Sequence, residues 1–362
     1  MKRWKEFYII STMLILLSVT ITTNILAQNI KQNLINIEPN KYKLNIKNID
    51  IIVDKYDNNN YNSIQSAINN ANTNSTIYVK KGYYNEIIYI NKKINLIGES
   101  NKTTIINPTS NKNSYAIKIS SENITISNLG IQNKGLGIYT TGIKVNAKNT
   151  TIKSCNIFET PVGIAIWTSE NTISECKFYK CLDEGIALLG TNNNILNSNL
   201  IKNCEFYNNC DGIELQYSSN NKILSCNFYN NTHAGIDSIS NLNDNNIILE
   251  CKFENNKAFG IFFSKSNDNI ISRCTFSNDK IMATESINIK IQQCKLNEIY
   301  LTDKSTITFD NCSDLKDTNI KMINSNYKIL NYDNLKTNLL KLKEKKQSLL
   351  LKILQIASIL KI

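Results

Sequence analysis

The sequence predicts an all-β protein, a parallel β-helix in which each turn of the chain stacks on the previous one as a rung of about 22 residues. Three observations predict this fold. A short motif centred on a cysteine, the Cys-X-Phe phrase, recurs with that period, and glycine and asparagine recur at similar distances from the cysteine. No segment between residues 76 and 332 sustains the apolar period of a helix. The abundance of isoleucine also favours strands, because β-branched side chains suit a pleated surface.

Eight of the ten cysteines stand in one recurring phrase, at spacings of 18 to 28 residues, and in five of them a phenylalanine follows two positions later. Alternate side chains of a strand share a face, so the cysteine and the residue two positions on should point inward and form two internal ladders. We expect these thiols to be structural, since free cysteine is commonly buried. The ladder comprises Cys155, Cys176, Cys204, Cys226, Cys251, Cys274, Cys294 and Cys312. Cys181 and Cys210 fall outside it and are the candidates for a disulfide.

Glycine and asparagine mark the turns of each predicted rung. A glycine followed by isoleucine opens a second short strand at Gly142, Gly163, Gly185, Gly212, Gly235 and Gly260. An asparagine lies five residues before the cysteine at Asn171, Asn199, Asn221, Asn246 and Asn269. Both residue types tolerate a left-handed backbone, so we expect them at tight turns, with the asparagine side chains hydrogen-bonded along a column.

The charge distribution argues against nucleic acid as a partner. Of the net charge of +11, residues 335–362 contribute +6 and residues 1–6 contribute +2, which leaves +3 for residues 7–334. Binding to phosphates needs a clustered basic face, which this nearly neutral body does not predict.

The two ends of the chain differ from its body. Residues 1–27 begin with basic residues and continue with about twenty apolar or hydroxyl residues to Ala27, which predicts a signal peptide or an uncleaved membrane anchor. Either places the protein outside the cytoplasm, secreted or at the cell surface or envelope. Residues 28–53 lead into the β-helix, predicted over residues 54–332. Residues 333–362 predict an amphipathic basic helix that caps the open end of the β-helix or lies on an anionic membrane surface.

Residues 61–100, YNSIQSAINNANTNSTIYVKKGYYNEIIYINKKINLIGES, predict an amphipathic capping helix with Ile64, Ala67, Ile68 and Ala71 on one side, followed by the first rungs. Together with the later repeats, this opening resembles the pectinesterase-like and NosD-like β-helix proteins. The resemblance implies a right-handed parallel β-helix, export, and a role with polysaccharides or at the cell envelope. The catalytic motifs of pectinesterases and alginate epimerases are not found, so the resemblance covers the fold and not the chemistry.

Two groups of side chains are candidates for a binding face. Phe158, Tyr179, Tyr207 and Tyr229 follow the inward position in four successive rungs and should form an outward aromatic stripe. Sugar rings stack on such aromatic groups. Stacking between neighbouring rungs that merely stabilises the solenoid explains the stripe equally well.

The second group is acidic and includes the only histidine of the chain, His233. Counted from the glycine, Glu214 and Asp237 occupy the same outward position in adjacent rungs, where two carboxylates repel each other. Such a pair suits a glycosidase, assisted by Asp211 or His233, or could equally hold calcium. A solvated acidic edge without function is the competing interpretation.

We therefore expect a monomeric, exported protein that binds a polysaccharide or cell-surface glycan through the stripe and the acidic turns, with no required cofactor. One alternative is a carbohydrate-active enzyme, a hydrolase, lyase or epimerase, that uses Glu214 and Asp237. Another is a structural or adhesin-like surface protein without catalysis. A lyase is disfavoured because the only arginine of the body, Arg273, should pair with Glu250 one rung away.

Overall fold

The computed structural model describes residues 49–57, 60–108, 114–135, 137, 140–313, 315 and 317–330. The predicted signal or anchor (1–27), most of the predicted lead-in (28–53) and the predicted basic helix (333–362) lie outside these residues. Within them, no helix is both long and apolar enough to cross a membrane.

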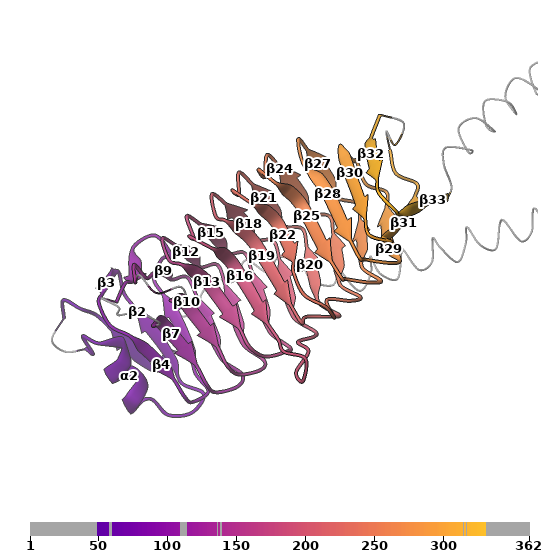
Figure 1. Cartoon of the computed structure of the whole chain (residues 1–362). Coiled ribbons are helices and arrows are strands. Elements are labelled where there is room, and N and C mark those ends of the chain that lie inside the picture. Colours follow the sequence, from indigo (N-terminus) through magenta and orange to yellow (C-terminus); the bar gives the residue numbers. More distant parts are fainter. Residues whose placement is uncertain are drawn as a thin grey trace, which may run out of the picture. The chain divides into compact units, whose positions relative to one another are not determined.

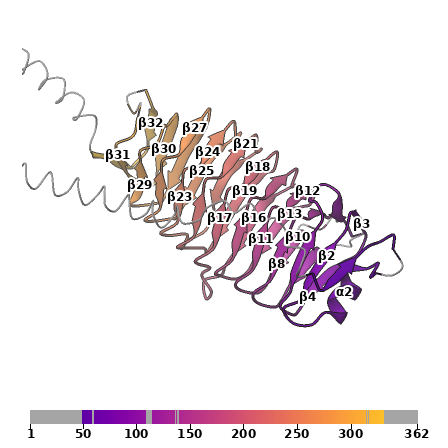
Figure 2. The ribbon, with the colours of Figure 1, turned by 180° about the vertical axis from the view of Figure 1, so that it is seen from behind.

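The described chain forms a right-handed parallel β-helix with three sheets, and successive rungs stack along its axis from the indigo end to the yellow end (Figures 1 and 2). Every strand-to-strand pairing between the named strands is parallel, as predicted. Sheet A has thirteen strands, sheet B nine and sheet C eleven.

Sheet A consists, in spatial order, of β1 (Ile51–Val53), β2 (Thr76–Val79), β5 (Asn95–Gly98), β8 (Thr125–Ser127), β11 (Thr151–Lys153), β14 (Thr172–Ser174), β17 (Leu200–Lys202), β20 (Lys222–Leu224), β23 (Ile247–Leu249), β26 (Ile270–Ser272), β29 (Ile289–Gln292), β31 (Thr306–Asp310) and β33 (Asn326–Leu330). Sheet B consists of β3 (Gly82–Tyr84), β6 (Thr104–Ile106), β9 (Gly130–Gln132), β12 (Asn156–Phe158), β15 (Lys177–Tyr179), β18 (Glu205–Tyr207), β21 (Asn227–Tyr229), β24 (Lys252–Glu254) and β27 (Thr275–Ser277). Sheet C consists of β4 (Ile88–Ile90), β7 (Tyr115–Ile119), β10 (Thr141–Val145), β13 (Val162–Ile166), β16 (Glu184–Leu189), β19 (Asp211–Gln216), β22 (Ala234–Ser238), β25 (Phe259–Ser264), β28 (Lys280–Thr284), β30 (Glu298–Thr302) and β32 (Asn319–Met322).

The predicted capping helix is present as α2 (Ile64–Asn70). Its apolar side, Ile64, Ala67 and Ile68, is fully buried. Ser63 caps the amino-terminal end by accepting a hydrogen bond from the backbone of Ser66 at 3.1 Å, which satisfies one of the free N–H groups of the first turn. The helix therefore covers the apolar interior at the first rungs.

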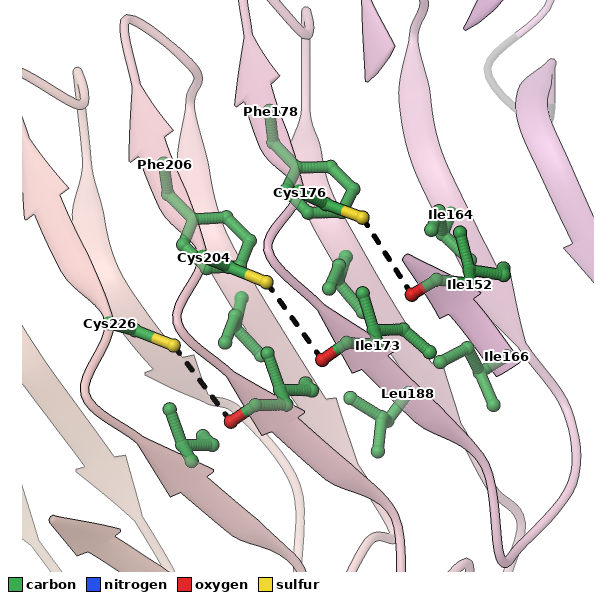
Figure 3. Packing of buried hydrophobic residues seen from close by; sticks show 14 of the residues in the cluster. Ile152, Ile164, Ile166, Ile173, Cys176, Phe178, Leu188, Cys204, Phe206 and Cys226 are labelled. Carbon is green, nitrogen blue, oxygen red and sulfur yellow. Dashed lines mark hydrogen bonds between the residues drawn. The ribbon is translucent and has the colours of Figure 1, made fainter. Parts of the chain in front are cut away.

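The two predicted internal ladders are confirmed. The phenylalanines stack with ring centroids 4.7 to 4.9 Å apart, from Phe178 to Phe276. The thiols point inward, and seven of the eight, all but Cys155, donate to a backbone carbonyl of the preceding rung, for example Cys204 Sγ to the carbonyl of Ile173 at 3.9 Å (Figure 3). All ten cysteines are free thiols, so the disulfide considered for Cys181 and Cys210 is absent. Packing and not cross-linking holds the rungs together.

The glycines of the Gly-Ile positions do not form the left-handed turns that were predicted for them. Their backbone is not left-handed, and an added Cβ on Gly163 would lie 2.2 Å from the carbonyl oxygen of Gly185 on the next rung. Glycine is needed there because adjacent rungs approach too closely for any side chain. The left-handed turns instead use the residue just before each ladder cysteine, such as Glu175 at φ 56° and Arg273 at φ 51°.

Asparagine side chains form the predicted hydrogen-bonded column, although these residues are not left-handed either. The side-chain oxygen of Asn246 accepts from the backbone N–H of Asn221 at 2.9 Å, and the same pattern recurs along the column. On the outer surface, Arg273 Nε donates to Glu250 at 2.9 Å, which confirms the predicted ladder salt bridge.

Candidate functional site

Three neighbouring strands of sheet C bring the acidic candidates together on its outward face. The register places Glu184 on β16 opposite Asp211 on β19, and Glu214 on β19 opposite Asp237 on β22. The last pairing is the one predicted from the sequence. His233 precedes β22 directly and completes the group. We call Glu184, Asp211, Glu214, His233 and Asp237 the acidic centre.

The first pair in this centre is Glu184 and Glu214, whose carboxyl groups lie close enough for the charge of Glu214 to act on Glu184. Two neighbouring carboxylates repel each other, which favours a proton on one of them. Burial, followed by the negative charge of Glu214, raises the pKa of Glu184 to about 9. Burial raises the pKa of Glu214 as well. Glu184 is therefore protonated at neutral pH.

The second group consists of Asp211 and Asp237, which both lie close to His233. Asp211 accepts hydrogen bonds from the backbone N–H of Ala234 at 2.7 Å and from His233 Nδ1 at 2.9 Å. The same Nδ1 lies 3.5 Å from Asp237 Oδ2. Donation from Nδ1 to Asp211 assigns the proton to that nitrogen and leaves Nε2 free.

Asp237 has a buried oxygen atom that lacks a hydrogen-bond partner. Its side chain is only 7% exposed, and its Oδ1 is buried without a hydrogen-bond partner. Burial, followed by the nearby charge of Asp211, raises the pKa of Asp237 to about 7. A buried carboxylate that lacks a partner is costly, and a raised pKa is the expected response.

The predicted residues Asp211, Glu214, His233 and Asp237 thus meet in one place, but Asp211 and Asp237 are buried and do not form an open acidic edge. The sequence indicates Glu184 only as one residue of an acidic turn, with Cys181 and Asp183, and does not bring it together with Glu214. The signal was available, because Glu184 precedes Gly185 as Asp211 precedes Gly212, and both residues therefore occupy the same position of the rung.

The predicted aromatic stripe lies on sheet B, on a different sheet from the acidic centre. Its rings stack on one another almost in parallel, with centroids 4.9 to 5.2 Å apart from Phe158 to Tyr229. Each inner ring therefore has both faces covered by its neighbours. The two end rings, Phe158 and Tyr229, each keep one face without an aromatic neighbour in the stripe. Tyr229 borders a shallow hollow of about 290 Å³ that is also lined by Lys252 and Glu254.

Other aromatic side chains flank the acidic centre on sheet C itself, and the sequence analysis missed them. Trp167 follows β13 and is 40% exposed. Phe259 contacts the ring of His233 edge-on at 5.9 Å, and Phe262 lies opposite Asp237 in the register. These residues stand outside the recurring Cys-X-Phe phrase, so the repeat pattern did not point to them.

Two groups in the described part of the chain have the donor atoms for a metal ion. Asp211, His233 and Asp237 form one, and Asp183, Cys210 and Asp211 form the other, each with ligand atoms within 4.8 Å of one another. Burial raises the pKa of the Cys210 thiol to about 11, so at neutral pH this thiol is protonated and is a poor ligand. The donors that remain are carboxylates and one imidazole.

Residues 139–301 match the family described as periplasmic copper-binding protein (NosD). The repeat region is NosD-like. This match and the fold confirm the resemblance predicted from the residue 61–100 opening and the later repeats. No curated protein matches the chain significantly.

The copper named for the NosD family would not find here the sulfur ligands that copper(I) prefers. The ladder thiols are turned into the core, where they donate to backbone carbonyls. The acidic centre offers two carboxylates beside a single imidazole, donor types that several divalent ions share. These donors argue against copper(I) and do not select one metal ion.

Solved structures with similar folds include a mannuronan epimerase and an alpha-1,3-glucanase. The A-module of the mannuronan C-5 epimerase AlgE4 from Azotobacter vinelandii matches with a TM-score of 0.61 and 13% identity over 75% of this chain and 93% of the module. The catalytic domain of a GH87 alpha-1,3-glucanase variant in complex with nigerose matches with a TM-score of 0.52 and 13% identity, over 81% of this chain and 67% of that one. At this identity the likeness concerns the fold.

Proposed function

We propose that this NosD-like β-helix is an exported, monomeric protein that binds a polysaccharide or cell-surface glycan across the outward face of sheet C, at the acidic centre. The observation that carries the proposal is the convergence of four carboxyl groups and the only histidine on one outward face. Burying several ionisable groups lowers stability, so a purely structural or adhesin-like solenoid has no reason to gather them.

The surroundings of the centre suit a sugar chain. The exposed Trp167 on one side and Phe259 and Phe262 on the other provide apolar surface beside hydrogen-bonding carboxylates. Known β-helix proteins with similar folds include an epimerase and a glucanase, and this supports a carbohydrate ligand for the same architecture. The periplasmic family that the repeats match is consistent with export.

A second candidate function is catalysis, and the raised pKa of Glu184 beside Glu214 favours it. A protonated carboxyl can donate its proton to a glycosidic oxygen as the bond from that oxygen to the anomeric carbon breaks. An ionised carboxylate can accept a proton from the water whose oxygen attacks the same carbon. Glu214, which is partly exposed, would contact the substrate. The protonated Glu184 beside it would be the source of the proton, and Asp237 would act as the base. Such hydrolysis needs no resident cofactor, and calcium held by Glu214 and Asp237 is the competing use of these carboxylates.

The test is a glycan array with the purified protein, followed by product analysis by mass spectrometry. We expect binding of at least one glycan class, and loss of binding or turnover in Glu214→Gln and Asp237→Asn with unchanged folding. Glu122→Gln, an exposed carboxylate outside sheet C, is the matched control. The products distinguish a hydrolase from a lyase or an epimerase, and loss of binding on chelation would indicate calcium. Unchanged binding in both variants would refute the role of the acidic centre.

A further inference from the structure

A second cluster on the outward face of sheet C joins lysines to aromatic rings. Lys118 on β7 lies opposite Lys144 on β10, and Tyr89 on β4 lies opposite Lys118. The Lys118 ammonium is 5.5 Å from the centre of the Tyr89 ring and 5.8 Å from that of Tyr115, while Lys144 is 5.4 Å from that of Trp167. We call these five residues the cation–aromatic cluster.

The two lysines are an unfavourable pair unless something else binds to them. Like charges directly opposite each other on neighbouring strands repel and destabilise a sheet. Among the described residues, no carboxylate lies within 4.0 Å of either ammonium group. The aromatic rings offset part of the repulsion, since cation–π contacts at exposed sites contribute roughly 0.5–1 kcal/mol each. An anion between the two ammonium groups would remove the repulsion altogether.

The cluster and the acidic centre belong to one continuous surface. Lys144, Ala165, Ala187 and Glu214 are successive partners in the register of β10, β13, β16 and β19. Three strand spacings of about 4.8 Å separate Lys144 from Glu214, or about 14 Å along the axis. The two alanines between them are buried in a small apolar cluster with Val162 and Leu189, so no long side chain of this column stands between the two sites.

The acidic centre does not cancel the charge of the cluster. A separation of about 14 Å exceeds the screening length of about 8 Å at physiological ionic strength. An anionic group over Lys118 and Lys144 would therefore experience the lysines and little of the carboxylates.

We propose that the cation–aromatic cluster is a subsite for an anionic sugar, and that the glycan bound over sheet C is an acidic polysaccharide. The aromatic rings would stack on the sugar, and the two ammonium groups would bind its carboxylate or sulfate group. This inference rests on the proposed glycan binding at sheet C and adds the chemical class of the ligand.

The experiment compares three oligosaccharides of equal length by titration calorimetry with the full chain. They are an oligogalacturonate, the same oligosaccharide with its carboxyl groups reduced to alcohols, and a sulfated neutral oligosaccharide. We expect at least one anionic form to bind at least about tenfold more tightly than the reduced form, because charge-assisted hydrogen bonds contribute roughly 1.5–3 kcal/mol. The preference should shrink at high salt. The two anionic arms distinguish a carboxylate from a sulfate ligand.

Single substitutions locate the effect. Lys118→Gln and Lys144→Gln should each remove most of the preference for the anionic form, whereas Lys222→Gln on β20 of sheet A should leave it unchanged. Trp167→Ala should weaken every form that binds. Equal binding of the reduced and anionic forms, insensitive to both lysine variants, would overturn the anionic subsite and leave glycan binding intact. Binding of none of the three, with no glycan recognised on the array, would overturn both proposals.

Discussion

Glu184 and Glu214 lie on adjacent strands of sheet C, and burial together with the charge of Glu214 raises the pKa of Glu184 to about 9. Two carboxylates close together repel each other, so a proton on Glu184 stabilises the pair. The pair makes the fold sensitive to pH at a point where stability alone would favour an apolar residue.

The first prediction concerns the stability that the protein loses when Glu184 is ionised beside Glu214. The folded state raises the pKa of Glu184 to about 9, above the value of about 4.3 in an unfolded chain, so the folded state binds the proton more tightly. The free energy of unfolding should therefore fall as pH rises from about 5 towards 9. Glu184→Gln keeps a hydrogen-bond donor and needs no proton. It should stabilise the protein at pH 8 by roughly 1–2 kcal/mol and have little effect at pH 4.

Urea unfolding at pH 4, 6 and 8 measures this difference, with Glu122→Gln as the exposed control. A destabilising effect of Glu184→Gln at pH 8 would show that folding does not raise the pKa of Glu184. The same variant should weaken the activity proposed for the acidic centre, so that stability and function change in opposite directions.

The second prediction concerns an asparagine column that the sequence analysis did not identify. Asn209, Asn231 and Asn256 are linked side chain to backbone in successive rungs, and the column ends at Asp279, which accepts from the backbone N–H of Asn256 at 3.2 Å. Burial raises the pKa of Asp279 to about 6. Asp279→Asn would extend the column with a neutral acceptor. We expect it to raise the free energy of unfolding by about 1 kcal/mol at pH 8. The effect should be small at pH 4, where the aspartic acid is protonated in the folded state and about half protonated in the unfolded state.

Thermal unfolding at the two pH values tests this prediction. Asp303→Asn, at an exposed turn, is the control. Equal stabilisation at pH 4 and pH 8 would mean that the gain does not come from the buried charge.

The third prediction concerns the close approach of rungs. An added Cβ on Gly212 would lie 2.4 Å from the carbonyl oxygen of Gly235 and 2.6 Å from the ring of Phe228. Gly212→Ala must therefore separate the rungs or displace the phenylalanine ladder, and it should destabilise the protein by about 1–3 kcal/mol or more. Calorimetric melting compares it with Asn146→Ala on the exposed surface. A melting temperature unchanged by Gly212→Ala would contradict the observed rung spacing.

The fourth prediction concerns the thiols. Alkylation at pH 8 followed by peptide mass spectrometry should label Cys210 and Cys312 first, because they are the partly exposed cysteines. Their labelling should be slow, since burial raises the pKa of each to about 11. Cys204 and Cys226 should stay unmodified until the protein unfolds. Rapid native labelling of either one would be incompatible with the internal ladder.

The repeat made the fold predictable. Residues two apart on a strand share a face, so the Cys-X-Phe phrase alone placed Cys204 and Phe206 in the core, and the recurrence of the phrase stacked the rungs. The pairing of Glu214 with Asp237 followed in the same way, by counting from a glycine in each rung.

The chemistry of the acidic centre was decided only by the tertiary structure. The rung between Cys176 and Cys204 is longer than its neighbours. Whether Glu184 comes close to Glu214 therefore depends on where in this rung the extra residues lie, because that position sets the register of β16 against β19. The stripe tyrosines were placed correctly on the surface, but local alternation does not say whether a ring face is open or covered by the next rung. Sequence sets which face a side chain takes, because that depends on its own strand. The burial and pKa of a carboxyl group, and the exposure of an aromatic ring face, depend on neighbours about 22 residues away. Only the stacked rungs bring those neighbours into contact.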